Sequence, residues 1–120
     1  MKEMSNQQPE TTAITSGRDD SHSLAPPIWT STTWQSSGLE ESRQRALATH
    51  QVGNYARYSN PTVRAFEQSI AELEGAQDAL AFGSGMGAVT SVILALCSRG
   101  DHIVAQRQLY GGTVAFLNGP

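Results

Sequence analysis

The sequence has 120 residues, a formal net charge of -3 and charges of both signs spread along the chain. This length sets a ceiling of one domain, and the absence of a basic stripe excludes nucleic acid and anionic membrane surfaces as partners. The N-terminus lacks the apolar stretch of about 7 to 15 residues of a signal peptide, and no run approaches the roughly 18 residues of a membrane span, so we expect a cytoplasmic protein.

Residues 1–59 are predicted to form an extended arm with loops. They are mostly polar up to residue 23, and the apolar groups of "LAPPIW" and "TW" that follow show neither the period of a strand nor that of a helix. The tail that carries Lys2, the only lysine of the sequence, is expected to be disordered. A loop region of this length is unusual inside a compact domain, so we expect the arm to pack on surfaces that the chain itself does not supply.

A helix is predicted to begin at Pro61, with Asn60 as its cap, and to end at Gly75. Its sequence separates an apolar stripe from a polar face at helical spacing. The stripe consists of Val63, Phe66, Ile70 and Leu73. The face expected to meet water consists of Arg64, Glu67, Gln68 and Glu72.

The remaining elements alternate in the way that is typical of a parallel α/β layer. A short strand over Leu80–Phe82, a glycine turn and a helix from about Met86 to Ser98 come first, and Arg99 and Gly100 are expected to end that helix. A second buried strand is predicted over 102–105, followed by a loop and by a helix capped by Thr113. Two strands cannot complete such a sheet, so residues 60–120 are interpreted as the start of a larger α/β domain.

The glycine turn "GSGMGA" (83–88) allows three interpretations. Gly83, Gly85 and Ala88 match the dinucleotide fingerprint G-x-G-x-x-G/A, but the acid expected after the second strand is missing, because Asp101 precedes that strand. A second interpretation is a single phosphate bound by backbone amides at the start of the Met86 helix. The third is a tight turn between strand and helix without a ligand.

Three further residues favour the phosphate. Tyr55 and Arg57 are two positions apart, so an extended backbone would place both side chains on the same side, where a phenol and a guanidinium can bind phosphate together. Tyr110 follows the second predicted strand, at the carboxyl edge where open α/β sheets bind ligands. Each of these residues also has a purely structural explanation, as surface decoration or loop packing.

Taken together, "YARYSNPT" (55–62), "SGM" (84–86) and the stretch from "DHIV" (101–104) to "LYGGT" (109–113) resemble one family. It comprises the pyridoxal 5'-phosphate (PLP) enzymes of cysteine and methionine metabolism: cystathionine gamma-synthase, cystathionine lyases, methionine gamma-lyase and O-acetylhomoserine sulfhydrylase. The resemblance begins near Ala25, in "APPIWTSTTW". It implies a fold-type I subunit with a large domain like that of aspartate aminotransferase, preceded by an extended arm, in a tetramer built as a dimer of dimers.

The resemblance also implies roles for individual residues. Ser84, Gly85 and Met86 would bind the cofactor phosphate, and Tyr110 would stack on the cofactor ring and take part in proton movements. Tyr55 and Arg57 would reach the phosphate of the neighbouring subunit's cofactor. The substrate would be an amino acid, and no metal site is predicted.

One feature of the family is missing from the sequence. Family enzymes hold PLP as a Schiff base on a lysine, and Lys2 in a polar tail does not fit that role. The first hypothesis is therefore an N-terminal fragment of a trans-sulfuration enzyme, inactive by itself. The alternatives are an NAD-binding Rossmann-like module and a non-catalytic piece that pairs with full-length subunits.

Overall fold

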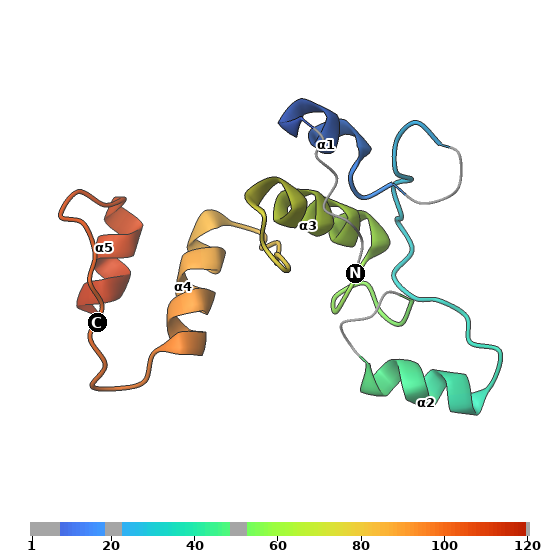
Figure 1. Ribbon diagram of the computed structural model, residues 1–120. Coiled ribbons are helices and arrows are strands. Elements are labelled where there is room, and N and C mark those ends of the chain that lie inside the picture. Colours follow the sequence, from blue (N-terminus) through green and yellow to red (C-terminus); the bar gives the residue numbers. More distant parts are fainter. Residues whose placement is uncertain (1–7, 19–22, 49–52, 120) are drawn as a thin grey trace. The chain divides into compact units, whose positions relative to one another are not determined.

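The computed structural model describes residues 8–18, 23–48 and 53–119, and these contain five helices and no β-strand (Figure 1). The helices are α1 (Pro9–Thr15), α2 (Leu39–Leu47), α3 (Pro61–Glu74), α4 (Gly85–Leu96) and α5 (Gly111–Asn118). They divide into two compact units, the first ending at Leu80 and the second beginning at Ala81. Lys2 lies outside the described residues.

The helix predicted from residue 61 is confirmed as α3. The side chain of Asn60 accepts a hydrogen bond from the Thr62 amide at 2.9 Å, and Pro61 occupies the first turn, where its missing amide hydrogen costs nothing. Gly75 ends the helix in the left-handed conformation, with φ of 64°. Both ends of α3 are therefore set by neighbouring residues in the sequence.

The face of α3 that is buried differs from the prediction. Glu67, which was expected to meet water, is 9% exposed, and the neighbouring Ala71 is 6% exposed. The four residues of the apolar stripe are between 37% and 57% exposed. The apolar stripe therefore does not mark the covered side of α3. Helix α1 packs on α3, and the turn after it contacts Ala65 and Glu72, which lie about half a turn around the helix from Glu67.

Helix α1 corrects the prediction of an arm without regular structure. It spans Pro9–Thr15 and is followed by a turn in which the Ser16 hydroxyl donates a hydrogen bond to the Glu72 carboxylate of α3. Gly17 has φ of +70°, and a Cβ atom added there would lie 2.4 Å from the carbonyl oxygen of Ala65. The turn thus passes so close to the backbone of α3 that only glycine fits.

Helix α2 is the second helix that the prediction missed. The amide of Ser37 donates to the Glu41 carboxylate at 2.6 Å, the Ser37 hydroxyl donates to the same oxygen, and Arg45 forms an ion pair with Glu41 one turn on. The two hydrogen bonds from Ser37 are the main cause of a lowered pKa of Glu41. Arg45 also donates to the carbonyl of Gly53 at 2.8 Å, which ties α2 to the segment that precedes α3.

In the second unit, α4 and α5 are confirmed as helices, but their ends differ from the prediction. Helix α4 ends at Leu96, because residues 98 to 101 form a turn of their own in which the Ser98 amide donates to the Asp101 carboxylate at 2.7 Å. Gly100 supplies the positive φ of 101° in that turn instead of ending the helix. Helix α5 begins at Gly111 with Tyr110 in the cap position, so Thr113 is inside the helix and is not its cap.

The two predicted strands are not formed in the described residues. Leu80 is 75% exposed and Val104 is fully exposed, and the residues around them make no β-ladder. A strand is defined by a ladder of hydrogen bonds to a neighbouring strand, and no such ladder involves either run within residues 8–18, 23–48 and 53–119. The β-pairing that is found is an isolated antiparallel bridge between Thr33 and Tyr55. Among the described helices, none is long and apolar enough to cross a membrane.

Candidate functional site

The glycine turn leads directly into α4, and Ser84 is the cap of that helix. Its hydroxyl accepts a hydrogen bond from the Gly87 amide at 3.0 Å, and its carbonyl accepts from the Ala88 amide at 3.1 Å. The amides of Gly85 and Met86 donate to no acceptor in the described part of the chain. Two hydrogen-bond donors at the positive end of a twelve-residue helix are thus left for a ligand or for water.

Neither Gly83 nor Gly85 is required by the turn itself. Neither residue has a positive φ, and a Cβ atom added at either position would meet nothing within 4 Å. Gly87 differs, since a Cβ there would lie 3.1 Å from the Ser84 hydroxyl oxygen. The interpretation as a tight turn without a ligand therefore accounts for Gly87 and leaves Gly85 unexplained.

An open hollow of about 510 Å³ lies beside this turn, and two helices line it. Its residues are Ser84, Gly85, Met86, Val89, Tyr110 and Thr113. The side chain of Tyr110 is 73% exposed, and the Thr113 hydroxyl is 3.5 Å from the Met86 sulfur. Four residues singled out in the sequence are thus brought together here, from two segments about 25 residues apart.

Val89 and Thr113 also line the hollow and were not predicted to do so. Val89 lies three residues after Met86, and Thr113 three residues after Tyr110, so each shares a helix face with a predicted residue. That spacing is visible in the sequence. Thr113 was instead interpreted as a helix cap.

Tyr55 and Arg57 lie in the first unit, and their side chains meet in a way that was not predicted. The backbone at 56–58 forms a turn and is not extended, with the Tyr58 amide donating to the Tyr55 carbonyl at 3.0 Å. The guanidinium carbon of Arg57 lies 5.0 Å from the ring centre of Tyr55 and 5.4 Å from that of Tyr58. Cation–π attraction to two rings therefore restricts where this guanidinium can point.

Asp101, the acid closest to the position that a dinucleotide fold requires, has a structural role. Its carboxylate accepts from the Ser98 amide, and its own amide donates to the Ser98 carbonyl at 3.0 Å. One oxygen of this carboxylate is thus used to hold the turn before residues 102–105, which gives Asp101 a structural explanation without a ribose. The turn therefore supports the argument against a dinucleotide site that the position of Asp101 in the sequence suggested.

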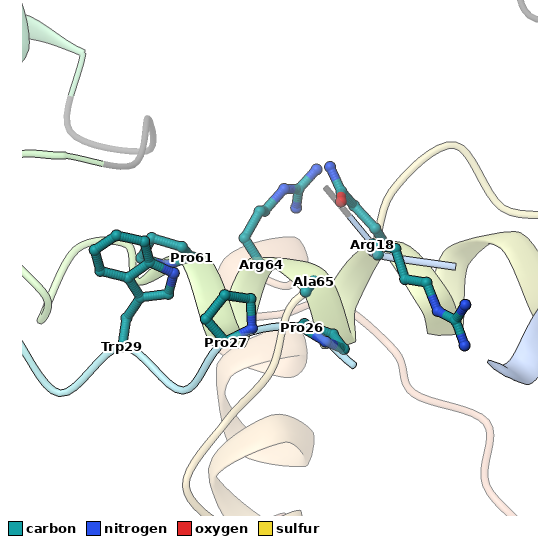
Figure 2. A pocket seen from close by; sticks show the side chains of 9 residues that line it. Arg18, Pro26, Pro27, Trp29, Pro61, Arg64 and Ala65 are labelled. Atoms are coloured by element: carbon teal, nitrogen blue, oxygen red, sulfur yellow. The ribbon is translucent and has the colours of Figure 1, made fainter. Parts of the chain in front are cut away.

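A second pocket, of about 220 Å³, lies in the first unit against α3 and was not predicted (Figure 2). Figure 2 shows Pro27 and Trp29 beside Pro61, while the Arg18 side chain extends away from them. Arg64 at its edge is paired with Asp78 at 2.7 Å, which raises the pKa of Arg64 and lowers that of Asp78. Four of its nine lining residues are proline or tryptophan, and none of the nine carries a carboxyl, imidazole, thiol, phenol or amine group, so the pocket offers no group suited to acid–base catalysis.

Comparison with known proteins identifies the family. Residues 10–119 match the family model described as Cys/Met metabolism PLP-dependent enzyme. O-acetyl-L-homoserine sulfhydrylase of Corynebacterium glutamicum is 48% identical over 88 residues, which are 72% of this chain and 20% of that protein. L-methionine gamma-lyase of Fusobacterium nucleatum is 37% identical over 111 residues, which are 90% of this chain and 28% of that protein.

A solved structure supports the same family assignment. The crystal structure of metB from Corynebacterium glutamicum matches with a TM-score of 0.78 and 37% identity, and the match covers 92% of this chain and 28% of that one. The chain thus spans between about a fifth and three tenths of the length of these relatives. The resemblance that the motifs carry is confirmed: the chain belongs to the Cys/Met metabolism family of PLP-dependent enzymes.

Proposed function

We propose that this chain supplies part of the cofactor site of a PLP-dependent enzyme that acts at the β or γ carbon of a sulfur amino acid or an O-acyl-homoserine. The names of the relatives support this substrate class, since they include O-succinylhomoserine and O-acetyl-L-homoserine sulfhydrylases and methionine gamma-lyases. The observation that carries the proposal is the hollow in which the unpaired amides of Gly85 and Met86 lie close to the exposed ring of Tyr110.

The residues of the hollow fit the two ends of the cofactor. A phosphate at the start of α4 would accept hydrogen bonds from the amides of Gly85 and Met86 and be stabilised by the helix dipole. The Ser84 hydroxyl accepts from Gly87 through its oxygen and keeps its hydrogen for a phosphate oxygen. Tyr110 offers a flat, exposed surface on which an aromatic ring can stack, and its phenol can exchange a proton with the substrate. PLP, when bound, supplies the electron sink for this chemistry.

Tyr55 and Arg57 are proposed to act on a neighbouring subunit's cofactor phosphate. Arg57 takes part in none of the ion pairs found among the described residues, so its forked donors are available for a phosphate. A role at a neighbouring site requires a homo-oligomer, and a dimer of dimers is the proposed assembly. The arm of residues 1–59 and the start of the large domain at 60–120 are the proposed parts of such a subunit.

These 120 residues alone are proposed to be catalytically inactive. The family chemistry needs a lysine that condenses with the cofactor aldehyde, and the sequence offers Lys2 only. Reduction with borohydride in the presence of PLP tests this directly. We expect no stoichiometric adduct and no turnover of O-acetylhomoserine or methionine, and a specific adduct accompanied by turnover would contradict the proposal.

The cofactor site itself is tested by titrating the full chain with PLP and, separately, with inorganic phosphate, while the amide signals of Gly85 and Met86 are followed by NMR. Gly85→Ala adds a methyl group to the open space over the turn and should weaken the binding of PLP and of phosphate about tenfold or more. Gly83→Ala is the matched control, because its Cβ also meets nothing but Gly83 does not line the hollow. Equal effects of the two substitutions would refute the site.

The ring end of the site is tested by Gly112→Ala. A Cβ at residue 112 would lie 2.7 Å from a ring carbon of Tyr110 and 3.3 Å from the Met86 sulfur, so the tyrosine ring must move. We expect PLP to bind more weakly while inorganic phosphate binds as before. The NAD-binding alternative predicts instead that NAD shifts the same amides and that Gly85→Ala abolishes this shift.

A further inference from the structure

Two segments of the first unit run side by side in opposite directions and are joined by hydrogen bonds at both ends. They are residues 27–33, from the stretch "PIWTSTT", and residues 55–62, from "YARYSNPT". At one end the Ala56 amide donates to the Thr32 carbonyl at 2.8 Å, next to the bridge between Thr33 and Tyr55. At the other end the contacts come from side chains at the start of α3.

Asn60 and Thr62 make those contacts. The Thr62 hydroxyl accepts from the Trp29 amide at 2.8 Å and donates to the Pro27 carbonyl at 3.0 Å. The Asn60 side-chain amide donates to the Trp29 carbonyl at 3.0 Å, while its oxygen caps α3. The two side chains therefore bind both polar groups of the Trp29 backbone, and we call these three bonds the α3 clamp.

Apolar burial does not replace these bonds. Ile28 is 82% exposed and contributes little burial, whereas Trp29 is 45% exposed and lies with Pro27 beside Pro61, so its ring adds to the attachment. Pro27 has no amide hydrogen and can be held only through its carbonyl, which is the group that Thr62 binds. The clamp therefore supplies the hydrogen bonds that fix the backbone of residues 27–29 on the first turn of α3, while the Trp29 ring packs beside Pro61.

The turn that presents Tyr55 and Arg57 lies between the two attachments. It is fixed on one side by its own bonds, from the Tyr58 and Ser59 amides to the Tyr55 carbonyl, and on the other side by the Thr32 carbonyl. If residues 27–29 leave α3, the Thr32 carbonyl is no longer held in place, and the second attachment of the turn is lost. Arg57 would then leave the narrow position over two tyrosine rings.

We propose that Asn60 and Thr62 are positioning residues for Tyr55 and Arg57: by clamping residues 27–29 they hold the turn that presents the guanidinium to the cofactor phosphate. This inference rests on the proposed function for the role of Arg57. No hydrogen bond among the described residues joins Asn60 or Thr62 to Arg57. They act through the backbone of the segment that contains Trp29 and Thr32.

Thr62→Val tests the clamp with little change of shape, because it removes the hydroxyl and leaves the Thr62 amide on the Asn60 cap. Amide exchange of the full chain should become about tenfold faster at Ala56, which lies far from the substituted group, as expected for the loss of a hydrogen bond. The Arg64 amide, bound to the Asn60 carbonyl at 2.8 Å, should exchange as before. Thr62→Ser keeps the hydroxyl and should restore the slow exchange at Ala56.

The position of Arg57 is measured by the upfield shift that the rings of Tyr55 and Tyr58 impose on its side-chain protons. Thr62→Val should remove most of that shift, and Thr62→Ser should retain it. Asn60→Asp, which keeps the cap oxygen and loses the donor to Trp29, should act like Thr62→Val.

The proposal is overturned if Ala56 and Arg57 are unaffected in Thr62→Val. It is also overturned if amide exchange at Arg64 becomes faster by the same factor as at Ala56, because the clamp would then support the whole unit and not only the turn. None of these measurements uses the cofactor. A failure of the proposed PLP site would therefore leave their outcome unchanged, and the two failures are distinguishable.

Discussion

Replacing Gly17 by alanine should detach α1 from α3. The residue has φ of +70°, where a residue with a side chain is less stable than glycine by about 1–2 kcal/mol. The new Cβ would also lie 2.4 Å from the oxygen and 2.9 Å from the carbon of the Ala65 carbonyl. Both are backbone atoms inside α3 and cannot rotate away, so overpacking adds about 1–3 kcal/mol. The total of about 2–5 kcal/mol opposes the docking of a helix of seven residues, which is too short to be stable alone.

Amide exchange followed by NMR measures the result. In the parent chain the Ser16 amide donates to the Thr12 carbonyl at 2.9 Å and reports on α1, while the Ala76 amide donates to the Ala71 carbonyl at 2.8 Å and reports on α3. In Gly17→Ala we expect Ser16 to lose its protection and Ala76 to keep it. This pattern would show that α1 leaves while α3 remains helical.

Gly75→Ala is the matched control for backbone strain. Gly75 has φ of +64°, close to that of Gly17, but a Cβ added there would meet nothing within 4 Å. Gly75→Ala should therefore lower the stability by only about 1–2 kcal/mol, the cost of the left-handed conformation, and leave α1 in place. The reasoning is refuted if Ser16 stays protected in Gly17→Ala, or if Gly75→Ala exposes Ser16 to the same extent.

Two further predictions concern charge and capping. Hydrogen bonding to Arg64 lowers the pKa of Asp78 in the folded chain, so the stabilisation from this pair should be complete above about pH 4 and should disappear as the pH falls through the lower folded pKa. A carbon NMR titration should show the pKa of Asp78 rising in Arg64→Met, and an unchanged value would contradict the pairing. Ser84→Ala removes the acceptor of the Gly87 amide and should destabilise α4 by about 0.5–2 kcal/mol in thermal unfolding followed by circular dichroism. Ser84→Thr keeps the cap, and an equal loss in both variants would count against it.

The features that could be predicted are those that depend on neighbours in the sequence. The bounds of α3 follow from Asn60, Pro61 and Gly75, because a cap, a proline and a left-handed glycine act over a few residues. The same applies to the start of α4 after the glycine turn, which was predicted within one residue of its position in the structure. The motifs were also sufficient to indicate the family, which the comparisons confirm.

Helix α2 could have been found from the sequence. Glu41 and Arg45 are four residues apart in the favourable order, with the acid first, and Ser37 precedes them as a hydrogen-bond donor to the first turn. The segment was instead interpreted as a loop because its few apolar residues show no helical period. A polar helix held by side-chain bonds gives only a weak signal of this kind.

The sequence by itself determined both ends of α3 and the start of α4 within one residue, because capping and turn formation are local properties. The tertiary structure decided that α1 packs on α3, through a contact of Gly17 with Ala65, almost fifty residues away in the sequence. It also decided that Tyr55 and Arg57 meet in a turn, and that the apolar runs at 80–82 and 102–105 form no strand in the described residues. The packing of α1 and the missing strands depend on partners distant in sequence, which local patterns do not specify. The turn at 55–58 is held by contacts among its own residues, but the spacing of Tyr55 and Arg57 alone favoured an extended backbone.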